Sequence, residues 1–247
     1  MNDFYLNMHD LLNWSLDCIF PKYCIGCKKE GFYVCQNCLS LIPILSHANC
    51  FLCGRRSPNG HICNNCNDKF HPKLKGLLVA SDWNNLLLRQ IIYTYKYKFI
   101  KELSEPLSYI MIKFLETIRF NNCKFDELVL IPVPLNKKRL IWRGYNQAEF
   151  LAQKISEYYL IPVNSEILKR SRSTLPQVEI KNRNERQKNI LGAFKINENM
   201  NGNFDLKNKI VILVDDVCTT SATLEECANV LKPLKPKEIF GLVIARG

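Results

Sequence analysis

The sequence has no uninterrupted apolar stretch that approaches the roughly 18 residues needed for a membrane-spanning helix. Its longest candidate, Ile210 to Val214, ends at two aspartates. Residues 1–20 contain three aspartates but neither lysine nor arginine, so the basic flank of a secretory signal is also missing. We therefore expect a cytoplasmic protein without a membrane span.

Two common catalytic motifs are missing as well. All four histidines lie in residues 1–71, so no Ser-His-Asp arrangement is expected. No Gly-x4-Gly-Lys-Ser/Thr sequence occurs, which argues against a nucleoside triphosphate P-loop. With 47% hydrophobic and 23% charged residues over 247 positions, the composition excludes collagen, coiled coil and wholesale disorder.

The net charge of +11 is concentrated in one segment. Residues 131–195 contain 13 of the Lys and Arg residues and carry a net charge of +8, whereas residues 1–70 carry only +1. A local excess of this kind favours a polyanion or a phosphorylated ligand. A solvated basic face is the alternative interpretation.

The cysteines indicate metal rather than disulfides, because a reducing cytoplasm keeps thiols free. Eight of the 12 form four Cys-x2-Cys pairs: Cys24, Cys27, Cys35, Cys38, Cys50, Cys53, Cys63 and Cys66. Two pairs complete a closed tetrahedron around one ion, so we predict two structural Zn²⁺ sites without a position for catalytic water. Redox cysteines are the alternative, His47 and His61 are possible competing ligands, and the spacing fits sequential and interleaved pairing equally.

The chain is expected to contain two domains. Residues 1–70 show no apolar periodicity beyond an opening helix, so zinc replaces a hydrophobic core there. From Leu74 onward, apolar strand-like runs alternate with helical patterns, which indicates βαβ units and a mostly parallel sheet in residues 71–247. The expected strands are 74–83, 128–133, 210–214 and 238–245, and the expected helices include 86–95 and 146–159. Residues 169–188 have neither periodicity and are expected to form a functional lid or a surface excursion.

The strongest local signal outside the cysteines is a buried strand that ends in two acids and a hydroxyl-rich turn. Asp215 and Asp216 are followed by Val217, Cys218, Thr219, Thr220, Ser221, Ala222 and Thr223. In open α/β sheets, ligands bind beyond the carboxyl ends of the strands, and the first turn of the next helix offers N–H groups to an anion. Two carboxylates suit a ribose diol better than a phosphate. The segment thus predicts a sugar 5-phosphate site, with a Thr-rich helix cap or a Walker B strand as weaker alternatives.

This segment resembles the diphosphate-sugar motif of the phosphoribosyltransferases. The resemblance implies that Asp215 and Asp216 hold the ribose hydroxyls of phosphoribosyl pyrophosphate, which binds with Mg²⁺. It also implies that the 217–223 backbone, with Thr219, Thr220 and Thr223, holds the 5-phosphate. Ser221-Ala222 stands where a glycine pair is more common, so a positive φ at Ser221 would bring strain or weaker phosphate binding.

Two further stretches narrow the family. Ile131-Pro132-Val133-Pro134-Leu135 leads to Arg139 and then to Arg143-Gly144-Tyr145-Asn146-Gln147, followed by Thr174, Gln177, Arg186, Asn189 and Phe194. Together with the cysteine pairs, residues 11–246 resemble the ComF family, which includes the GntX proteins. That family joins an N-terminal double zinc ribbon to a type I phosphoribosyltransferase domain, an α/β fold with helices on both faces of a mostly parallel sheet.

The basic residues in these stretches suggest how a diphosphate is bound. Guanidinium groups match phosphate oxygens, so Pro132, Val133, Arg139 and Arg143 are expected to surround the pyrophosphate, unless they form an exposed basic loop. By resemblance, Thr174 and Gln177 belong to a loop that closes over the active site and excludes water.

ComF membership also implies a part in natural competence, in which DNA is taken up and handled as single strands. Tyr93, Tyr95, Tyr97 and Phe99 alternate with Lys96 and Lys98, as in single-strand-binding surfaces, although Tyr95 also falls on the predicted helix face. Two hypotheses follow. The protein is either a phosphoribosyltransferase with an unidentified acceptor or a binding module that senses phosphoribosyl pyrophosphate or single-stranded DNA. In the second case the ribbons would recruit DNA or competence and recombination proteins.

Overall fold

A computed structural model describes residues 21–57, 60–118, 124–172, 189–198 and 205–247. Contacts divide the chain into two compact units, Met1–Ile42 and Pro43–Gly247. This division differs from the predicted boundary at residue 70. The segment that contains the second group of four cysteines, which we call the second cysteine module, hydrogen-bonds to the first strand of the sheet and to Lys75, the residue before that strand. Leu45 donates to the carbonyl of Ala80, and Ile62 donates to that of Lys75.

The described part of the first unit is built around its cysteines. Cys24 N–H donates to Lys29 O at 2.8 Å, and Lys28 N–H donates back to Cys24 O at 2.9 Å, which closes a tight turn around the first cysteine pair. Lys28 takes a left-handed conformation with φ of 64° in this turn. The short helix α2 (Gln36–Leu39) then places the second pair, since it begins directly after Cys35.

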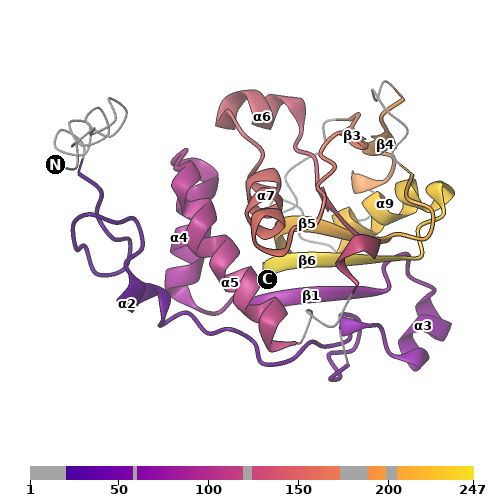
Figure 1. Ribbon diagram of the computed structural model, residues 1–247, viewed down its shortest axis with the longest axis horizontal. Coiled ribbons are helices and arrows are strands. Elements are labelled where there is room, and N and C mark those ends of the chain that lie inside the picture. The colour runs from indigo at the N-terminus through magenta and orange to yellow at the C-terminus, as the bar shows by residue number, and fades with distance from the viewer. Residues whose placement is uncertain (1–20, 58–59, 119–123, 173–188, 199–204) are drawn as a thin grey trace, which may run out of the picture. The chain divides into compact units, whose positions relative to one another are not determined.

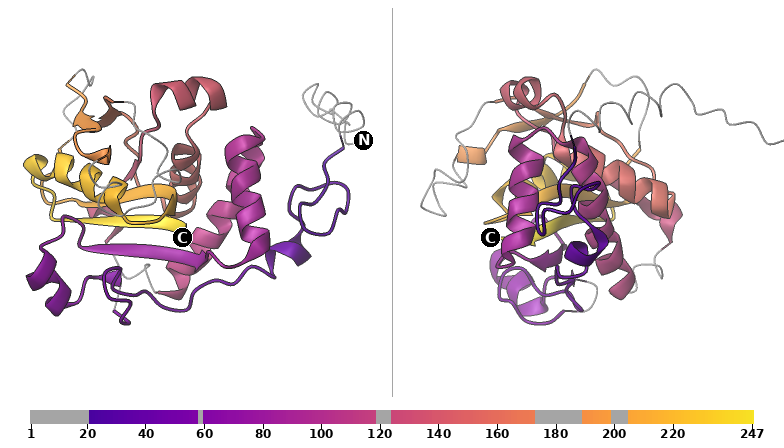
Figure 2. Two further views of the ribbon diagram at one scale, coloured as in Figure 1. Left: turned by 180° about the vertical axis from the view of Figure 1, so that it is seen from behind. Right: turned by 90° about the vertical axis from the view of Figure 1, so that its left-hand side faces the viewer.

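The second unit is organised around a four-stranded sheet whose strands are all parallel. The strands are β1 (Gly76–Asp82), β2 (Leu128–Pro132), β5 (Ile210–Cys218) and β6 (Glu238–Arg246), in the order β1-β6-β5-β2. Figure 1 and Figure 2 show β1, β6 and β5 lying side by side. Parallel strands covered on both faces are expected to be almost continuously apolar, and the seven central residues of β6 are all buried.

Helices cover both faces of the sheet. The helix α5 (Ser104–Thr117) contacts β1 and β6, and α7 (Gln147–Tyr159) contacts β2 and β5. On the opposite face, α9 (Ala222–Leu231) shares a buried cluster with Val211 and Leu213 of β5. Because side chains alternate along a strand, Ile212 and Val214 face the α7 side. The remaining elements are α3 (Asn64–Phe70), α4 (Leu86–Tyr97), η2 (Lys101–Leu103), η4 (Phe125–Glu127), α6 (Lys137–Arg143), β3 (Leu168–Arg170), β4 (Phe194–Ile196) and η6 (Lys232–Leu234).

Asparagine side chains begin three of these helices. The side chain of Asn85 accepts a hydrogen bond from Leu88 N at the start of α4, and Asn136 does the same for Lys138 N at the start of α6. Asn146 caps α7 through Ala148 N. Such caps satisfy backbone N–H groups that lack an acceptor within the helix. They fix the starts of the helices that carry the basic and aromatic residues discussed below.

The predicted fold class is confirmed, as are strands near 74–83, 128–133, 210–214 and 238–245 and helices near 86–95 and 146–159. The main difference concerns β5, which continues through both aspartates to Cys218 because these residues still pair with β6. The predicted opening helix and most of the 169–188 loop lie outside the described residues. Within the described part of the chain, no helix is long and apolar enough to cross a membrane.

Candidate functional site

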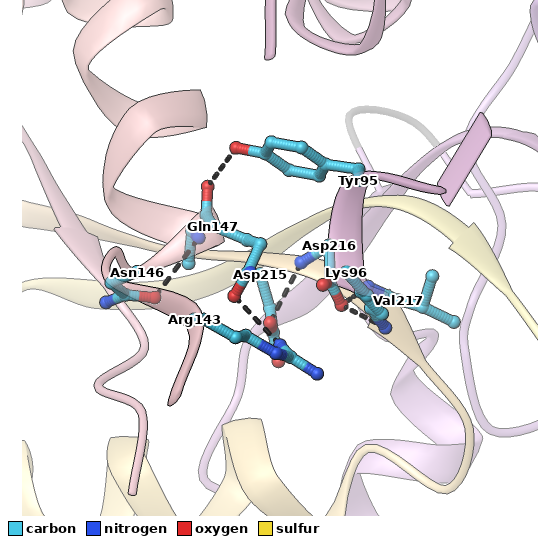
Figure 3. A network of polar contacts seen from close by, with 9 residues as sticks. Tyr95, Lys96, Arg143, Asn146, Gln147, Asp215, Asp216 and Val217 are labelled. Atoms are coloured by element: carbon cyan, nitrogen blue, oxygen red, sulfur yellow. Dashed lines mark hydrogen bonds and ion pairs between the residues drawn. The ribbon is translucent and has the colours of Figure 1, made fainter. Parts of the chain in front are cut away.

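The site is built on the carboxyl end of β5. Asp215 and Asp216 are adjacent strand residues, so their side chains leave opposite faces of the sheet. Asp216 N–H donates to Asp215 Oδ1 at 2.8 Å, and Val217 N–H donates to Asp216 Oδ1 at 2.6 Å. Figure 3 shows both contacts. Each carboxylate is therefore anchored by the backbone of the next residue.

A lysine from a helix that is distant in the sequence forms an ion pair with Asp216. Lys96, in the last turn of α4, places its Nζ 2.8 Å from Asp216 Oδ1 (Figure 3). The side chains of the two residues are only 22% and 9% exposed, so their charges are largely shielded from water. The alternation of aromatic residues and lysines in the sequence places Lys96 on a nucleic-acid surface and does not indicate this contact, which joins residues 120 positions apart.

Asp215 has an unusual titration behaviour. Burial and repulsion from Asp216 raise its pKa to about 7, against the opposing attraction of Lys96 and Arg170. Near neutral pH, this carboxyl group is thus partly protonated when no ligand compensates its charge. Perturbed pKa values of this kind are frequent at functional sites.

The turn after the acids contains the positive φ at Ser221 that predicts backbone strain. Ser221 takes φ of 63° and ψ of 2°, the left-handed region that favours glycine. Its Oγ accepts a hydrogen bond from the Cys218 thiol at 3.4 Å. A small pocket here is lined by Asp215, Val217, Cys218, Thr219, Ser221, Ala222, Thr223 and Leu224.

This turn offers donors that suit an anion. Among the described residues, Thr220 Oγ1 is a buried hydroxyl without a hydrogen-bond partner. The first N–H groups of α9 have no acceptor within the helix, and the helix dipole favours negative charge at that end. A buried orphaned hydroxyl and a helix N-terminus of this kind fit a phosphate group.

Arg170 is a basic residue whose charge is influenced by Arg139 and by Asp215. Arg170, on β3, stacks its guanidinium 5.2 Å from the centre of the Phe194 ring. Burial and repulsion from Arg139 lower its pKa below the ordinary value, and attraction to Asp215 opposes this shift only in part. Arg139 and Arg170 are thus within electrostatic reach of each other and suited to a diphosphate. The sequence motif identifies Arg139, whereas no local pattern indicates Arg170.

Arg143 has a less direct position. It ends α6, is only 7% exposed, and donates to Gln147 Oε1 at 2.9 Å. Its guanidinium also lies 5.3 Å from the centre of the Tyr97 ring. Arg143 Nε and Gln147 Nε2 are buried without partners among the described residues. The alternative of an exposed basic loop does not apply to Arg143, which is packed inward, and its predicted role at the pyrophosphate stays a prediction.

The segment from Pro132 to Pro134 lies beside the end of β5. Pro132 pairs with Val214, and Val133 N–H donates to Val214 O at 2.9 Å. Asn146 Nδ2 donates to Val133 O at 3.1 Å, which ties this turn to the start of α7. A role of Pro132 and Val133 in pyrophosphate binding stays a prediction. Thr174, Gln177 and Arg186 lie outside the described residues.

The eight paired cysteines form two separate clusters: Cys24, Cys27, Cys35 and Cys38, and Cys50, Cys53, Cys63 and Cys66. In each, the four sulfur atoms lie within 4.8 Å of one another. The Sγ atoms of Cys27 and Cys35 are 3.6 Å apart, and so are those of Cys53 and Cys63. Four Zn–S bonds of about 2.3 Å in a tetrahedron place the sulfur atoms roughly 3.8 Å apart, which is close to these distances. The donor sets therefore fit zinc, and the pairing is sequential.

The two histidines considered as competing ligands make other contacts. His47 Nδ1 lies 3.1 Å from Ser46 Oγ, and His61 lies 3.5 Å from Glu238 and edge-on to Phe240. Neither belongs to a metal-ligating cluster among the described residues. Cys218 and Cys227, which belong to neither cluster, are buried.

Comparison with known proteins agrees with this geometry. The chain matches the double zinc ribbon domain over residues 15–67 and the phosphoribosyl transferase domain over residues 142–246. It is 28% identical to Competence protein F of Haemophilus influenzae over 90% of each chain. It is 31% identical to Competence protein ComFC of Bacillus subtilis over 82% of this chain and 79% of the relative. The chain belongs to the ComF family.

Another ComF relative is the DNA utilization protein YhgH of Escherichia coli strain K12, which is 28% identical over 74% of this chain and 77% of the relative. The phosphoribosyl transferase match includes Arg143, the acid pair and the turn over residues 217–223, which we call the phosphate turn after its predicted ligand. It begins after Pro132, Val133 and Arg139, and neither domain match includes α4. The Lys96 contact thus comes from a part of this ComF chain that lies between the two recognised domains.

Proposed function

We propose that this ComF-family protein binds phosphoribosyl pyrophosphate with Mg²⁺ at the end of β5 and transfers its phosphoribosyl group to an acceptor during DNA uptake. The observation that carries the proposal is the acid pair directly followed by a turn whose buried Thr220 hydroxyl and helix N-terminus suit a phosphate. The names of its relatives, two competence proteins and a DNA utilization protein, support the biological setting.

Each part of the substrate has a chemical counterpart in the site. The carboxylates of Asp215 and Asp216 can accept hydrogen bonds from the ribose hydroxyls. The N–H groups at the start of α9 and the buried Thr220 hydroxyl suit the 5-phosphate. Arg139 and Arg170 can neutralise the diphosphate, and a bound Mg²⁺ would supply further positive charge to stabilise it.

The proposed transfer breaks the bond between C1 of the ribose and the diphosphate oxygen. Pyrophosphate departs with the bonding electrons, and a nucleophile on the acceptor forms a new bond to the positively charged C1. Asp215 and Asp216 hold the sugar so that C1 faces the acceptor, while the arginines stabilise the charge of the departing group.

A second candidate function, single-stranded DNA binding, is favoured by a row of exposed aromatic side chains that we call the aromatic ridge: Tyr93, Tyr97, Phe99 and Trp142. Their exposed fractions lie between 40% and 59%. Ring centres are 4.7 Å apart for Tyr93 and Tyr97, 6.2 Å for Tyr97 and Trp142, and 5.0 Å for Phe99 and Trp142. Exposed rings beside lysines can stack with unpaired bases.

The ridge differs from the patch predicted from sequence. Tyr95 is fully buried, and its hydroxyl donates to Gln147 O at 3.0 Å, so it belongs to the core. Lys96 faces Asp216 instead of solvent. Trp142, from α6, takes a place beside Tyr97 and Phe99 that no local pattern indicated. Lys98, Lys137 and Lys138 are exposed and supply positive charge on the elements that carry the ridge.

The decisive experiment is calorimetric titration of the zinc-loaded protein with phosphoribosyl pyrophosphate in the presence of Mg²⁺. Pyrophosphate release is then followed with bases, nucleosides and single-stranded DNA as acceptors. Asp215→Asn and Asp216→Asn should weaken binding and abolish release if the site transfers the sugar. Binding without release would support the sensing module, and no binding by the wild type would refute both forms of the proposal.

A further inference from the structure

The contact between Lys96 and Asp216 raises a question about ligand binding, because one carboxylate oxygen already has two donors. Asp216 Oδ1 accepts from Val217 N–H at 2.6 Å and lies 2.8 Å from Lys96 Nζ. The side chain of Asp216 is 9% exposed, so little water competes for it. A ribose hydroxyl that approaches this oxygen has to displace the ammonium group.

Displacing the ammonium is unfavourable unless it finds another anion. The Lys96 side chain is only 22% exposed, so a released charge would stay poorly solvated. A diphosphate attached to C1 of the same sugar supplies negative charge close to the hydroxyls that the acids bind. Ribose 5-phosphate has the same hydroxyls and the same 5-phosphate, but it has no diphosphate to receive the lysine.

The surroundings of Lys96 allow this exchange with little movement of the backbone. The preceding residue, Tyr95, is fully buried and donates from its hydroxyl to Gln147 O. Its own carbonyl accepts from the Tyr145 hydroxyl at 2.5 Å. These contacts hold the last turn of α4 against α7, whereas the four-carbon side chain of Lys96 can rotate between two anions.

We propose that Lys96 determines the specificity of the site for the diphosphate-bearing sugar. Without ligand it pairs with Asp216, and with phosphoribosyl pyrophosphate bound it pairs with the diphosphate and releases Asp216 to the ribose. This inference rests on the proposed function, and it assigns to α4 a positioning role in discriminating the substrate from ribose 5-phosphate.

The test compares the affinities of wild type and Lys96→Met for phosphoribosyl pyrophosphate and for ribose 5-phosphate, both measured calorimetrically with Mg²⁺. A charge-assisted contact to the diphosphate predicts that Lys96→Met weakens phosphoribosyl pyrophosphate binding by roughly tenfold to a hundredfold. Ribose 5-phosphate binding should stay constant or strengthen, because Asp216 no longer has to be freed. Lys207→Met, at an exposed lysine that has no role in either candidate site, is the control and should change neither affinity.

Three further variants keep the test decisive. Asp216→Asn should weaken both ligands similarly and preserve their ratio, since both use the ribose hydroxyls. Lys96→Arg should retain part of the preference, because it keeps the charge, and Lys96→Gln replaces Lys96→Met if that variant does not fold. An equal loss for both ligands, or no loss in either, would overturn the role of Lys96. If wild type binds neither ligand, the proposed function itself fails.

Discussion

Arg246 connects Phe51 of the second cysteine module with the phosphate turn. Its Nη1 donates to the carbonyl of Phe51, which lies between Cys50 and Cys53. Its Nε donates to the carbonyl of Thr219 at 3.4 Å. One guanidinium at the end of β6 therefore links a metal-ligating loop to the segment expected to hold the 5-phosphate. The second zinc cluster and the candidate site belong to the same compact unit.

Replacing this link should loosen the phosphate turn without removing the metal. Arg246→Met loses two partly buried hydrogen bonds from a charged donor, which contribute up to about 1.5–3 kcal/mol each, and the 3.4 Å contact to Thr219 contributes less than the other. We expect phosphoribosyl pyrophosphate to bind about fivefold to thirtyfold more weakly, with zinc content unchanged. Calorimetry and metal analysis measure these two quantities. Arg172→Met, which removes another arginine bound to main-chain carbonyls, is the control.

Substituting one cysteine in each cluster should show that the two clusters bind zinc independently. Wild-type protein prepared under reducing conditions is expected to contain about two zinc ions per chain, because each cluster supplies four thiolates. Cys53→Ser should lower the count to about one and reduce the melting temperature of the sheet-containing unit, since its module hydrogen-bonds to the first strand and its approach. Cys27→Ser should lower the zinc count equally and provides the comparison. A wild-type protein without zinc would contradict the assignment.

The parts of the site that sequence predicts best are continuous in the chain. The acid pair, the hydroxyl-rich turn and the four cysteine pairs each occupy a few consecutive positions, so spacing alone carries their chemistry. Lys96 and Arg170 could not be found in this way, because they reach the acids from α4 and from β3 through tertiary packing. Even Arg143, which was identified, packs inward against Gln147, a contact that a count of positive charge cannot reveal.

The fold shows the same limit. Strands buried on both faces are recognisable as apolar runs, and helices with one buried face as periodic patterns. The short strands β3 and β4 have three residues each, too few for a periodicity. The end of β5 was placed before the acids because charged residues usually leave a buried strand, whereas pairing with β6 continues to Cys218.

Ser221 offers a test of backbone strain. A residue with a Cβ in the left-handed region costs about 1–2 kcal/mol relative to its relaxed state, and glycine avoids most of this cost. Ser221→Gly and Ser221→Ala both lose the hydrogen bond from the Cys218 thiol, so each loses about 1 kcal/mol from this source. Only glycine also relieves the strain, and after the entropy that glycine loses on folding, Ser221→Gly should have a free energy of unfolding up to about 1 kcal/mol higher than Ser221→Ala. Urea unfolding distinguishes the two, and equal effects would exclude strain.

The aromatic ridge predicts a loss of single-stranded DNA binding without a loss of fold. Stacking of one base on an aromatic side chain contributes about 1–3 kcal/mol, so Trp142→Ala should weaken binding of a fluorescent oligonucleotide by roughly fivefold or more. Tyr109→Ala removes a similarly exposed ring on α5, outside the ridge, and should leave affinity unchanged. Equal weakening by both substitutions would mean that the ridge has no special role.

The last prediction concerns pH and follows from Asp215. Its pKa in the folded protein is raised to about 7 by burial and by Asp216, well above the ordinary value of 3.8. Between these values the folded state binds more protons than the unfolded state, so the free energy of unfolding falls as pH rises from about 4 to about 7. Below this window the carboxyl is protonated in both states, and above it the full cost of the buried charge is present.

Asp215→Asn replaces this carboxyl with a neutral group of similar shape, so it should flatten the dependence and make the ligand-free protein more stable near neutral pH. Urea unfolding at a series of values from about pH 5 to about pH 8 measures the slope in both proteins. Asp126→Asn, at an exposed aspartate, is the matched control and should keep the wild-type slope. If Asp215→Asn also keeps that slope, Asp215 is not the titrating group, and its environment is more polar than the contacts around β5 indicate.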